Sequence, residues 1–471
     1  MRTLDSGSNY SLTAISLADA TDAAEGELKM NRSAANWRER WADRLGTAAQ
    51  AVSLARSGNR VWTGGWTSVP MTLCSALAAR HRELSDVEVY TFLTPFIWDR
   101  PDVLESFRVV TGFVGPYDRA AVRAGRIDYV PLSLPLEGQM PAGLNLNFDI
   151  AMIPISPPDE EGWCSFGGGV FFGEVAANCA KTLIGEVHSE FIRTGGANRI
   201  HISRFTRLAE AQGLAVRPPI APRSEETAAA AEAICTLLAL EVIPDRATLQ
   251  IGVGDVSAAL PAFLGEKHDL GIHTEILPGG VIELLKRGVV TNRYKSAHPG
   301  KVVAAGLVLM PSEELAELDG HPDVELYDII HTNDPTLLMR LGNLVAVNNA
   351  LAVDLTGNVC SEAVGPQLFS GPGGQPSFAI AASVTSGLSV IVLPSSELVG
   401  KRRLTRIVAG HPAGSTVTVP RMFVDVVVTE QGVARLRGKT LRQRIGEMIA
   451  IAYPDFRGEL RTEAKRLYGV G

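Results

Sequence analysis

From about residue 36 onward, short apolar runs alternate with amphipathic segments, and this alternation constrains the fold more than any other feature of the chain. The runs RVWTGGW (60–66), DVEVYTFL (86–93), IDYVPLSL (127–134) and DIAMIPIS (149–156) have the length and composition of strands. We expect VFFGEVAANCAKTLIGEV (170–187) to form a helix. Such alternation is typical of a mostly parallel sheet that is covered by helices. The sequence therefore predicts an α/β fold.

A Pro- and charge-rich passage, RPPIAPRSEET (217–227), interrupts the alternation and is the predicted domain boundary. Because 471 residues are too many for one ordinary core, we expect an N-terminal α/β domain over residues 35–216 and a C-terminal α/β domain over residues 217–471. Residues 1–34 are low in aromatics and rich in Ala, Ser, Asp and Glu, which predicts a flexible leader.

After the boundary the same alternation begins again. Residues 225–240 predict a long, alanine-rich helix. The predicted strands that follow are TLQIGVG, LGIHTEIL, KVVAAGLVL, LVAVNNALAVDL, LSVIVLP and VDVVVT. The two halves of the chain are therefore expected to be α/β units of similar size.

Charge and cysteine content exclude several classes of protein. The formal net charge is −7, so we expect no nucleic-acid partner. No apolar run approaches the about 20 residues of a membrane helix, and the polar N-terminus lacks an apolar signal core, which predicts a cytoplasmic protein without membrane contact. The five cysteines form no CxxC pair and the chain has no HExxH, so we expect reduced thiols and no metal site.

Loops at the carboxyl ends of strands are where open α/β sheets bind ligands, and the first such loop is glycine-rich. It reads Gly252-Val253-Gly254-Asp255-Val256 and opens a predicted helix. Ser257 stands where a dinucleotide fingerprint has its third glycine, which argues against a nicotinamide oxidoreductase. A plain strand-to-helix turn is an equally good interpretation, but the turn also offers free backbone N–H groups to an anionic oxygen.

A second loop, residues 370–378, places three glycines in four positions before another predicted helix. Gly371, Gly373 and Gly374 would let the backbone approach a ligand closely, and Gln375 follows them. The alternative is a plain turn before a helix. The loop lacks the lysine and hydroxyl residue of a phosphate loop.

The third stretch is LGIHTEIL (270–277), in which polar residues interrupt an apolar run that we expect to be one buried strand. Glu275 lies near its end and precedes the Pro-Gly-Gly at 278–280. Taken alone, Glu275 is best explained as a cap or ion-pair partner of the following helix. Strand alternation would place His273 on the same face as Glu275, but a histidine in a strand is usually a packing residue and we assign it no catalytic role.

These three loops carry a resemblance to a known family. The runs QIGVG, LGIHTE, VAVNNALAVDLTGNVCSE, GPGGQPSF and VVVTEQGVARLRGK occur in the family's order within a match from Trp37 to Leu467. The sequence resembles the acetyl-CoA hydrolase/transferase family of the class I CoA-transferases, which includes 4-hydroxybutyrate CoA-transferases. The resemblance implies two related open α/β domains with the active site at their interface, and a homodimer.

The resemblance also implies an activity and a nucleophile. Members of the family move CoA between an acyl-CoA and a free small carboxylic acid, such as acetate or 4-hydroxybutyrate, without a permanently bound cofactor. They do so through a glutamyl-CoA thioester, and the matching glutamate here is Glu275. A carboxylate suits reversible transfer, because every species along the path is an anhydride or a thioester.

Further roles follow from the same resemblance. Backbone N–H groups of the two glycine loops would stabilise the oxyanion, together with Asn348 or Asn349. The lysine that many relatives carry soon after the turn at residues 394–396 is missing here, so Lys401 or Arg402 is a candidate for the CoA phosphates. Gln431 and Ser377 also depart from the usual Tyr and Asp, which leaves the identity of the acid open.

Three other functions compete with CoA transfer. An acyl-CoA hydrolase would use the same Glu275, with water in place of the acceptor acid. A non-catalytic acyl-CoA-binding protein would keep the fold but has no need for a carboxylate at the thioester. A nicotinamide oxidoreductase is disfavoured because the third glycine and a clear ribose-binding acid are both missing.

Overall fold

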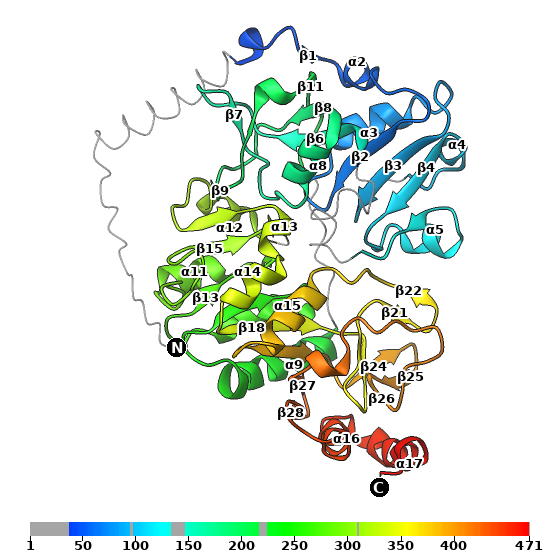
Figure 1. Ribbon diagram of the computed structural model, residues 1–471, viewed down its shortest axis with the longest axis vertical. Helices are drawn as coiled ribbons and strands as arrows, with labels where there is room; N and C mark the ends of the chain where they lie inside the picture. The colour runs from blue at the N-terminus through cyan, green and yellow to red at the C-terminus, as the bar shows by residue number, and fades with distance from the viewer. Residues whose placement is uncertain (1–36, 95–97, 133–146, 216–223, 309, 471) are drawn as a thin grey trace, which may run out of the picture.

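The computed structural model describes residues 37–94, 98–132, 147–215, 224–308 and 310–470, and the predicted leader at residues 1–34 lies outside them. The chain forms two parallel sheets, one from each half, with helices around them (Figure 1). The predicted α/β class is therefore confirmed. No helix in the described ranges is long and apolar enough to cross a lipid bilayer.

The N-terminal half forms an eight-stranded sheet in which every neighbouring pair of strands is parallel. It contains all four predicted strands of this half, although the run at 127–134 forms only a two-residue strand, with residues beyond 132 outside the description. In spatial order the strands are β1 (Leu45–Gly46), β11 (Arg207–Glu210), β8 (Ala180–Val187), β6 (Phe148–Ile155), β2 (Arg60–Gly65), β3 (Val87–Phe92), β4 (Phe107–Thr111) and β5 (Asp128–Tyr129).

The period of two along these strands divides their side chains between two cores. Val61 and Val89 face a cluster that includes residues of the surrounding helices. Trp62 and Tyr90 face the opposite way, into a cluster shared with the C-terminal half. The helices of this half are α2 (Ala48–Val52), α3 (Met71–Ala78), α4 (Pro101–Leu104), α5 (Arg119–Arg123) and α8 (Gly173–Cys179).

The predicted helix at residues 170–187 is wrong in its second part. Helix α8 ends at Cys179, and Ala180–Val187 forms β8, which pairs in parallel with β6 on one side and β11 on the other. Central strands of a parallel sheet are apolar on both faces, and therefore lack the alternation that distinguishes a strand from a buried helix. Because no proline or turn sequence separates the two elements, the sequence shows one uninterrupted segment.

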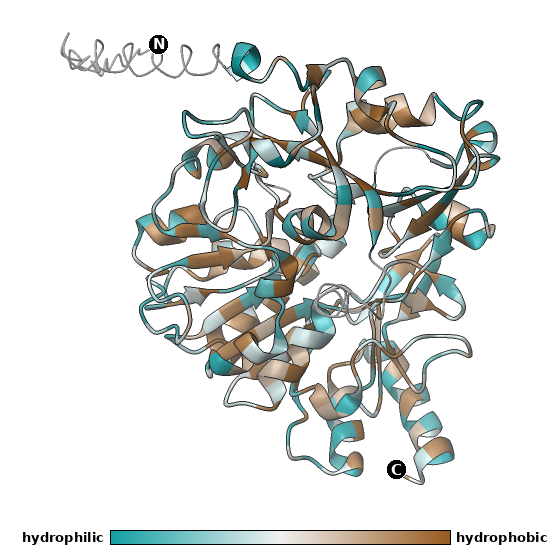
Figure 2. Cartoon of the chain, turned by 45° about the horizontal axis from the view of Figure 1, so that its top comes forward, coloured by the Kyte–Doolittle hydropathy of each residue, from teal (hydrophilic) through white to brown (hydrophobic). Residues whose placement is uncertain are grey.

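The C-terminal half forms a six-stranded sheet that is parallel except for its last pair. Figure 2 shows hydrophobic residues along these strands and polar residues on the outward turns of the helices. The spatial order is β13 (Gly271–Ile272), β12 (Thr248–Ile251), β18 (Leu344–Asn349), β23 (Leu388–Val392), β27 (Val426–Thr429) and β28 (Gly432–Arg435).

The helices of this half cover the sheet and extend to the C-terminus (Figure 1). The predicted helix at residues 225–240 is confirmed over Glu225–Leu237, after which the chain widens into a π-helical turn at Leu238–Val242. The helices are α9 (Glu225–Leu237), α10 (Asp255–Ala259), α11 (Val281–Lys286), α12 (Ser312–Glu317), α13 (Ile329–Thr332), α14 (Pro335–Arg340), α15 (Gln375–Ser383), α16 (Leu441–Ala450) and α17 (Arg457–Tyr468).

The stretch LGIHTEIL is not the single buried strand that the sequence predicts. Gly271–Ile272 pairs with β12 in the main sheet, whereas β14 (Ile276–Leu277) pairs with β16 (Gly306–Leu307) in a separate two-stranded sheet. Residues 273–275 cross between the two sheets. The polar residues therefore mark a crossover and not the interior of a strand.

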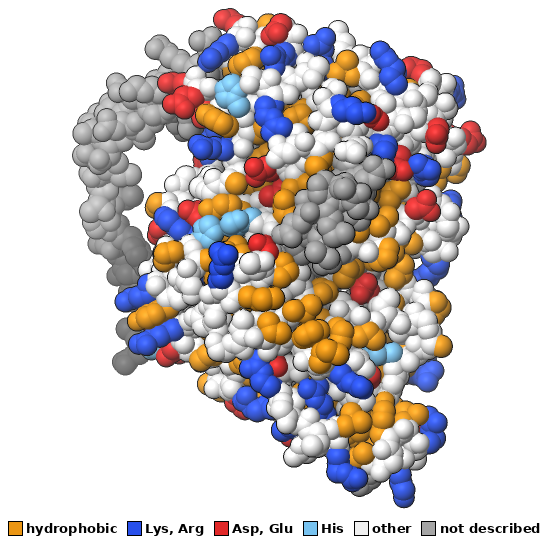
Figure 3. All heavy atoms as spheres, in the orientation of Figure 1, with side chains coloured by type: hydrophobic (Ala, Val, Ile, Leu, Met, Phe, Trp, Pro, Cys, Tyr) orange, Lys and Arg blue, Asp and Glu red, His pale blue; other side chains and the backbone are white. Residues whose placement is uncertain are grey.

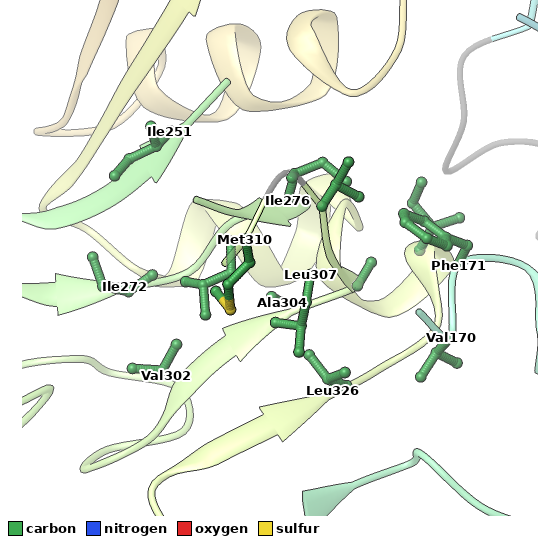
Figure 4. Packing of buried hydrophobic residues seen from close by; sticks show 14 of the residues in the cluster. Val170, Phe171, Ile251, Ile272, Ile276, Val302, Ala304, Leu307, Met310 and Leu326 are labelled. Atoms are coloured by element: carbon green, nitrogen blue, oxygen red, sulfur yellow. The ribbon is translucent and has the colours of Figure 1, made fainter. Parts of the chain in front are cut away.

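A short loop of the N-terminal half is bound to this same region. The Val170 and Phe171 N–H groups donate to the Ala305 carbonyl (3.0 and 3.2 Å), and the Leu307 N–H donates to the Gly168 carbonyl (2.7 Å). Figure 4 shows Val170 and Phe171 at one end of the apolar cluster around β15 (Val302–Ala304) and β16. The two halves are thus joined directly beside β14.

Candidate active site

The backbone of Glu275 is fixed on both sides. Its carbonyl oxygen accepts hydrogen bonds from the N–H groups of Ala305 (2.9 Å) and Gly306 (3.1 Å). The hydroxyl of Thr274 donates to the Ile251 carbonyl (3.0 Å), and the Ile251 N–H donates back to that hydroxyl (3.2 Å). The crossover is therefore attached to β12 and to the peptides before β16, and the Glu275 side chain starts from a fixed position.

The Glu275 carboxyl group is partly buried and has two hydrogen-bond donors. The Asn333 amide donates to Oε2 (2.7 Å), and the backbone of Gly374 provides a second hydrogen bond. Burial raises the pKa of Glu275 to about 7, although both hydrogen bonds act in the opposite direction. A carboxylate that has lost most of its water but remains oriented is suited to act as a nucleophile or a base.

Gly374 must be a glycine for this contact to exist. A Cβ on Gly374 would lie 2.3 Å from Glu275 Oε2 and 2.5 Å from Asn333 Nδ2. Its backbone angles, φ −81° and ψ −10°, are open to any residue, so the close approach alone requires the missing side chain. Helix α15 begins at the next residue, so Gly374 is the N-cap of that helix.

His273 holds the segment that carries Asn333, the hydrogen-bond partner of Glu275. It is fully buried, its Nε2 donates to the Thr332 carbonyl (2.9 Å), and burial lowers its pKa to about 3. Thr332 ends α13 and directly precedes Asn333. His273 is therefore a neutral, buried residue that holds the end of α13.

The two asparagines at the end of β18 have different partners. Asn348 and Gln250 exchange two amide hydrogen bonds (2.8 and 3.1 Å). Asn349 donates to the Val253 carbonyl (3.1 Å) and to the Ser257 hydroxyl (2.5 Å), so it holds the first glycine loop against β18. Both side chains are thus oriented by other residues at the carboxyl ends of β12 and β18.

A cavity of about 1020 Å³, which we call the outer cavity, lies in front of Glu275 and has a size typical of ligand sites. Trp66, Phe113 and Arg119 of the N-terminal half line it opposite residues of the C-terminal half. Figure 3 shows hydrophobic side chains gathered across the middle of one face, between the upper and lower halves. The predicted site residues that line this outer cavity are Glu275, Gly252, Val253, Gly254, Asp255, Val256, Asn348, Asn349, Gly371, Gly373, Gly374 and Gln375.

Lys401 lies apart from the other predicted residues. It is exposed in the turn between β24 (Ser396–Val399) and β25 (Arg402–Thr405) and does not line the outer cavity. Gln431 does line the outer cavity, whereas Ser377 is buried within α15.

Three residues of the site were missed from the sequence. Asn333 binds the Glu275 carboxyl, and Arg119 and Arg406 are positively charged residues of the outer-cavity lining. The Arg119 Nε donates to the Phe369 carbonyl (2.8 Å) across the two halves. All three lie far from Glu275 in sequence. Of them, Asn333 falls in the Thr-Asn-Asp-Pro turn at 332–335.

Comparison with known proteins agrees with this architecture. The chain matches the acetyl-CoA hydrolase/transferase N-terminal domain over residues 29–216 and the acetyl-CoA hydrolase/transferase C-terminal domain over residues 312–464. It is 36% identical to a 4-hydroxybutyrate coenzyme A transferase of Clostridium kluyveri, over 92% of this chain and 100% of that protein. It is 32% identical to a succinyl-CoA:acetate/propanoyl-CoA:succinate CoA transferase of Fasciola hepatica, over 88% and 86%.

Solved structures show the same relationship. RipA from Yersinia pestis superimposes with a TM-score of 0.83 at 30% identity, covering 92% of this chain and 99% of that one. A 4-hydroxybutyrate CoA-transferase from Porphyromonas gingivalis gives a TM-score of 0.72 at 28% identity, covering 92% and 100%. The fold and the cavity define a two-sheet α/β protein with a partly buried glutamate between its halves. The chain belongs to the acetyl-CoA hydrolase/transferase family.

The raised pKa of Glu275 predicts a pH-dependent effect on stability. Between its ordinary value of 4.5 and the value of about 7 in the folded chain, the folded state binds more protons than the unfolded state. Stability therefore falls as the pH rises through this range and stays lower above it. We expect Glu275→Gln, which cannot ionise, to raise the free energy of unfolding at pH 8 by roughly 1–3 kcal/mol, and by less at pH 5. Urea-unfolding curves at both pH values measure this, and an equal gain at both would contradict it.

The contact between Gly374 and Glu275 predicts a selective loss of activity. We expect Gly374→Ala to lower turnover by about 100-fold or more, because its methyl group displaces the Glu275 oxygen and the donor beside it. The melting temperature should change little, since the backbone angles suit alanine. Gly410→Ala is the control, because nothing lies within 4 Å of its Cβ. A similar loss in both variants would assign Gly374 a merely structural role.

Proposed function

We propose that the chain is a CoA-transferase that moves CoA between an acyl-CoA and a free small carboxylic acid, with Glu275 as the nucleophile and a glutamyl-CoA thioester as the intermediate. The observation that carries this proposal is the Glu275 carboxyl, partly buried, oriented by Asn333 and Gly374, and facing the outer cavity. The Clostridium kluyveri and Fasciola hepatica relatives, which are named CoA transferases, support it.

The chemistry follows from the nucleophile. Glu275 attacks the acyl carbonyl of the acyl-CoA, the carbon–sulfur bond breaks, and a mixed anhydride and CoA thiolate form. The thiolate attacks the glutamyl carbonyl, which releases the first acid and leaves CoA on Glu275. An incoming carboxylate then attacks that thioester, again forming an anhydride and a thiolate. The thiolate attacks the new acyl carbonyl, so that the second acyl-CoA leaves and Glu275 is regenerated without consumption of water.

Each of these steps passes through a tetrahedral oxyanion. The backbone of Gly374, at the start of α15, bonds the Glu275 carboxyl and would donate to an oxyanion formed there. Removal of one such donor typically lowers the rate by about 10² to 10³. Desolvation of Glu275 also strengthens its attack, because a carboxylate with little water around it has less to lose as its charge disperses.

The outer cavity is the proposed site for CoA. Both halves line it, and Lys401 does not. Arg119 is the proposed partner of the CoA phosphates, together with Arg406, whose guanidinium is also paired with Glu397 (2.7 Å). The homodimer, the cytoplasmic location and the boundary at residue 217 remain predictions that rest on the family resemblance and on composition.

A covalent adduct would test the function directly. With acyl-CoA and no acceptor acid, the protein should become heavier by CoA less water, and borohydride should then inactivate it with the lesion in residues 272–276. Acetate added before borohydride should protect, because the acceptor removes the CoA. Mass spectrometry of the intact protein and of its peptides measures this.

Two variants show whether the adduct depends on Glu275. Glu275→Ala should form no adduct, whereas Glu283→Ala, an exposed glutamate on α11, should behave as the wild type. Free CoA that accumulates without any acid, with no trapped adduct, would replace the transferase with the hydrolase. An adduct on another residue would remove Glu275 from the mechanism.

A further inference from the structure

A second, smaller cavity lies behind Glu275. It has about 30 Å³ of space and shares Glu275, Trp66 and Phe113 with the outer cavity. The rest of its lining comes mainly from the N-terminal half, at β2, the end of β3 and residues 166–173. This inner cavity therefore reaches the Glu275 carboxyl from the side of the N-terminal sheet. The outer cavity, which is the proposed CoA site, reaches the same carboxyl from the other direction.

The lining of the inner cavity is apolar and aromatic. Seven of its eighteen described residues are Trp or Phe, and none of the eighteen is Lys, Arg or His. Apart from Glu275, the one charged or hydroxyl-bearing side chain among them is Ser68, whose hydroxyl donates to the Gly169 carbonyl (2.6 Å). A group that enters this space meets hydrocarbon and finds no described cation to pair with.

The rings that define the inner cavity are closely packed. A Cβ on Gly65 would lie 2.4 Å from the Phe92 Cβ, and a Cβ on Gly169 would lie 2.6 Å from the Phe171 ring. Phe92 also packs against Phe172, with ring centroids 5.2 Å apart. Because glycines bring the backbone against these rings, the rings have little room to move, and the cavity keeps a short, fixed depth.

Two bulky residues of the lining adopt a left-handed backbone. Trp66 has φ 54° and Phe171 has φ 40°, a conformation that is costly for large side chains. Such conformations persist where the surrounding structure enforces them, and they concentrate at functional sites. Trp66 lines both cavities, and Phe171 lines the inner cavity.

We infer that the inner cavity binds the hydrocarbon chain of the transferred acid and restricts the enzyme to short monocarboxylic acids with an uncharged chain. This inference rests on the proposed function, because the reacting carbonyl must lie at Glu275 for the chain to extend inward. Phe92, Phe171 and Trp66 are the residues that set the size limit.

Charge sets the second limit. The far carboxylate of a dicarboxylic acid would enter an apolar space without a counter-ion, which is strongly unfavourable. The missing counter-ion therefore excludes dicarboxylic acids, although it does not make monocarboxylic acids bind more tightly. The length limit is softer, since one methylene changes the rate by only about 10- to 200-fold in a hydrophobic pocket.

Discharge of the preformed CoA adduct by matched acids tests the charge limit. 4-Oxopentanoate should remove CoA from the protein more slowly than butyrate because of its length, and succinate should be at least 100-fold slower in kcat/KM than 4-oxopentanoate because of its second carboxylate. Succinate and 4-oxopentanoate have the same shape and differ in that one oxygen anion replaces a methyl group. Stopped-flow or quenched-flow mass spectrometry of the intact protein measures each rate.

The outcomes separate the two proposals. If no adduct forms at all, the proposed function fails before any acid is compared. If the adduct forms and succinate discharges it within 10-fold of butyrate, the assignment of the inner cavity fails and the function stands. Discharge by succinate within 10-fold of discharge by 4-oxopentanoate would also overturn the charge limit, because the two acids differ only in that anionic oxygen.

A pair of variants tests the size limit. Phe92→Leu should raise the kcat/KM ratio of hexanoate to butyrate by about 10-fold or more, because it removes ring atoms from the lining. Phe107→Leu is the matched control, since Phe107 is equally buried on β4 but belongs to the core on the other face of the sheet. An equal ratio in both variants and the wild type would overturn the assignment of Phe92.

Discussion

The hydrogen bonds around the peptides of Ala305 and Gly306 are the interaction on which the rest of the site depends. Their N–H groups hold the carbonyl of Glu275, and the Ala305 carbonyl accepts the N–H groups of Val170 and Phe171. One short segment therefore fixes the candidate nucleophile and also attaches the N-terminal half. Because both contacts are made by the backbone, they depend on the path of the chain more than on particular side chains. The peptide that joins Ala305 and Gly306 therefore bonds both Glu275 and the N-terminal half.

Two opposing effects set the pKa of Glu275, and they determine the electrostatics of the site. Burial disfavours the charge on Glu275, whereas Asn333 and the Gly374 backbone favour it, and burial is the larger effect. Both donors are neutral, so they orient the carboxylate without neutralising it. A cationic partner would have lowered the pKa and weakened the nucleophile. Polar but uncharged neighbours keep Glu275 reactive while they fix its direction.

Much of the fold could be predicted from the sequence, because apolar strands and amphipathic helices have distinct periods. Prediction failed where that signal is missing. No turn sequence marks the point within residues 170–187 where a helix and a strand meet, and LGIHTEIL is apolar on both sides of a crossover. At the site, the loop glycines and Glu275 carried recognisable patterns. Asn333 did not, because its contact with Glu275 joins residues that are distant in sequence, and Lys401 was placed by proximity along the chain alone.

A single inner cavity beside a single carboxylate makes the proposed enzyme symmetrical with respect to its two acids. The acid that leaves and the acid that arrives would use the same apolar space in turn, because the inner cavity adjoins Glu275 and the outer cavity is the proposed site for CoA. Every good acceptor should therefore also be a good donor once it carries CoA, and each acid should compete with the other. Within that shared set, the protein cannot favour one direction of exchange. The relative concentrations of the acids and their thioesters then decide which way CoA flows in the cell.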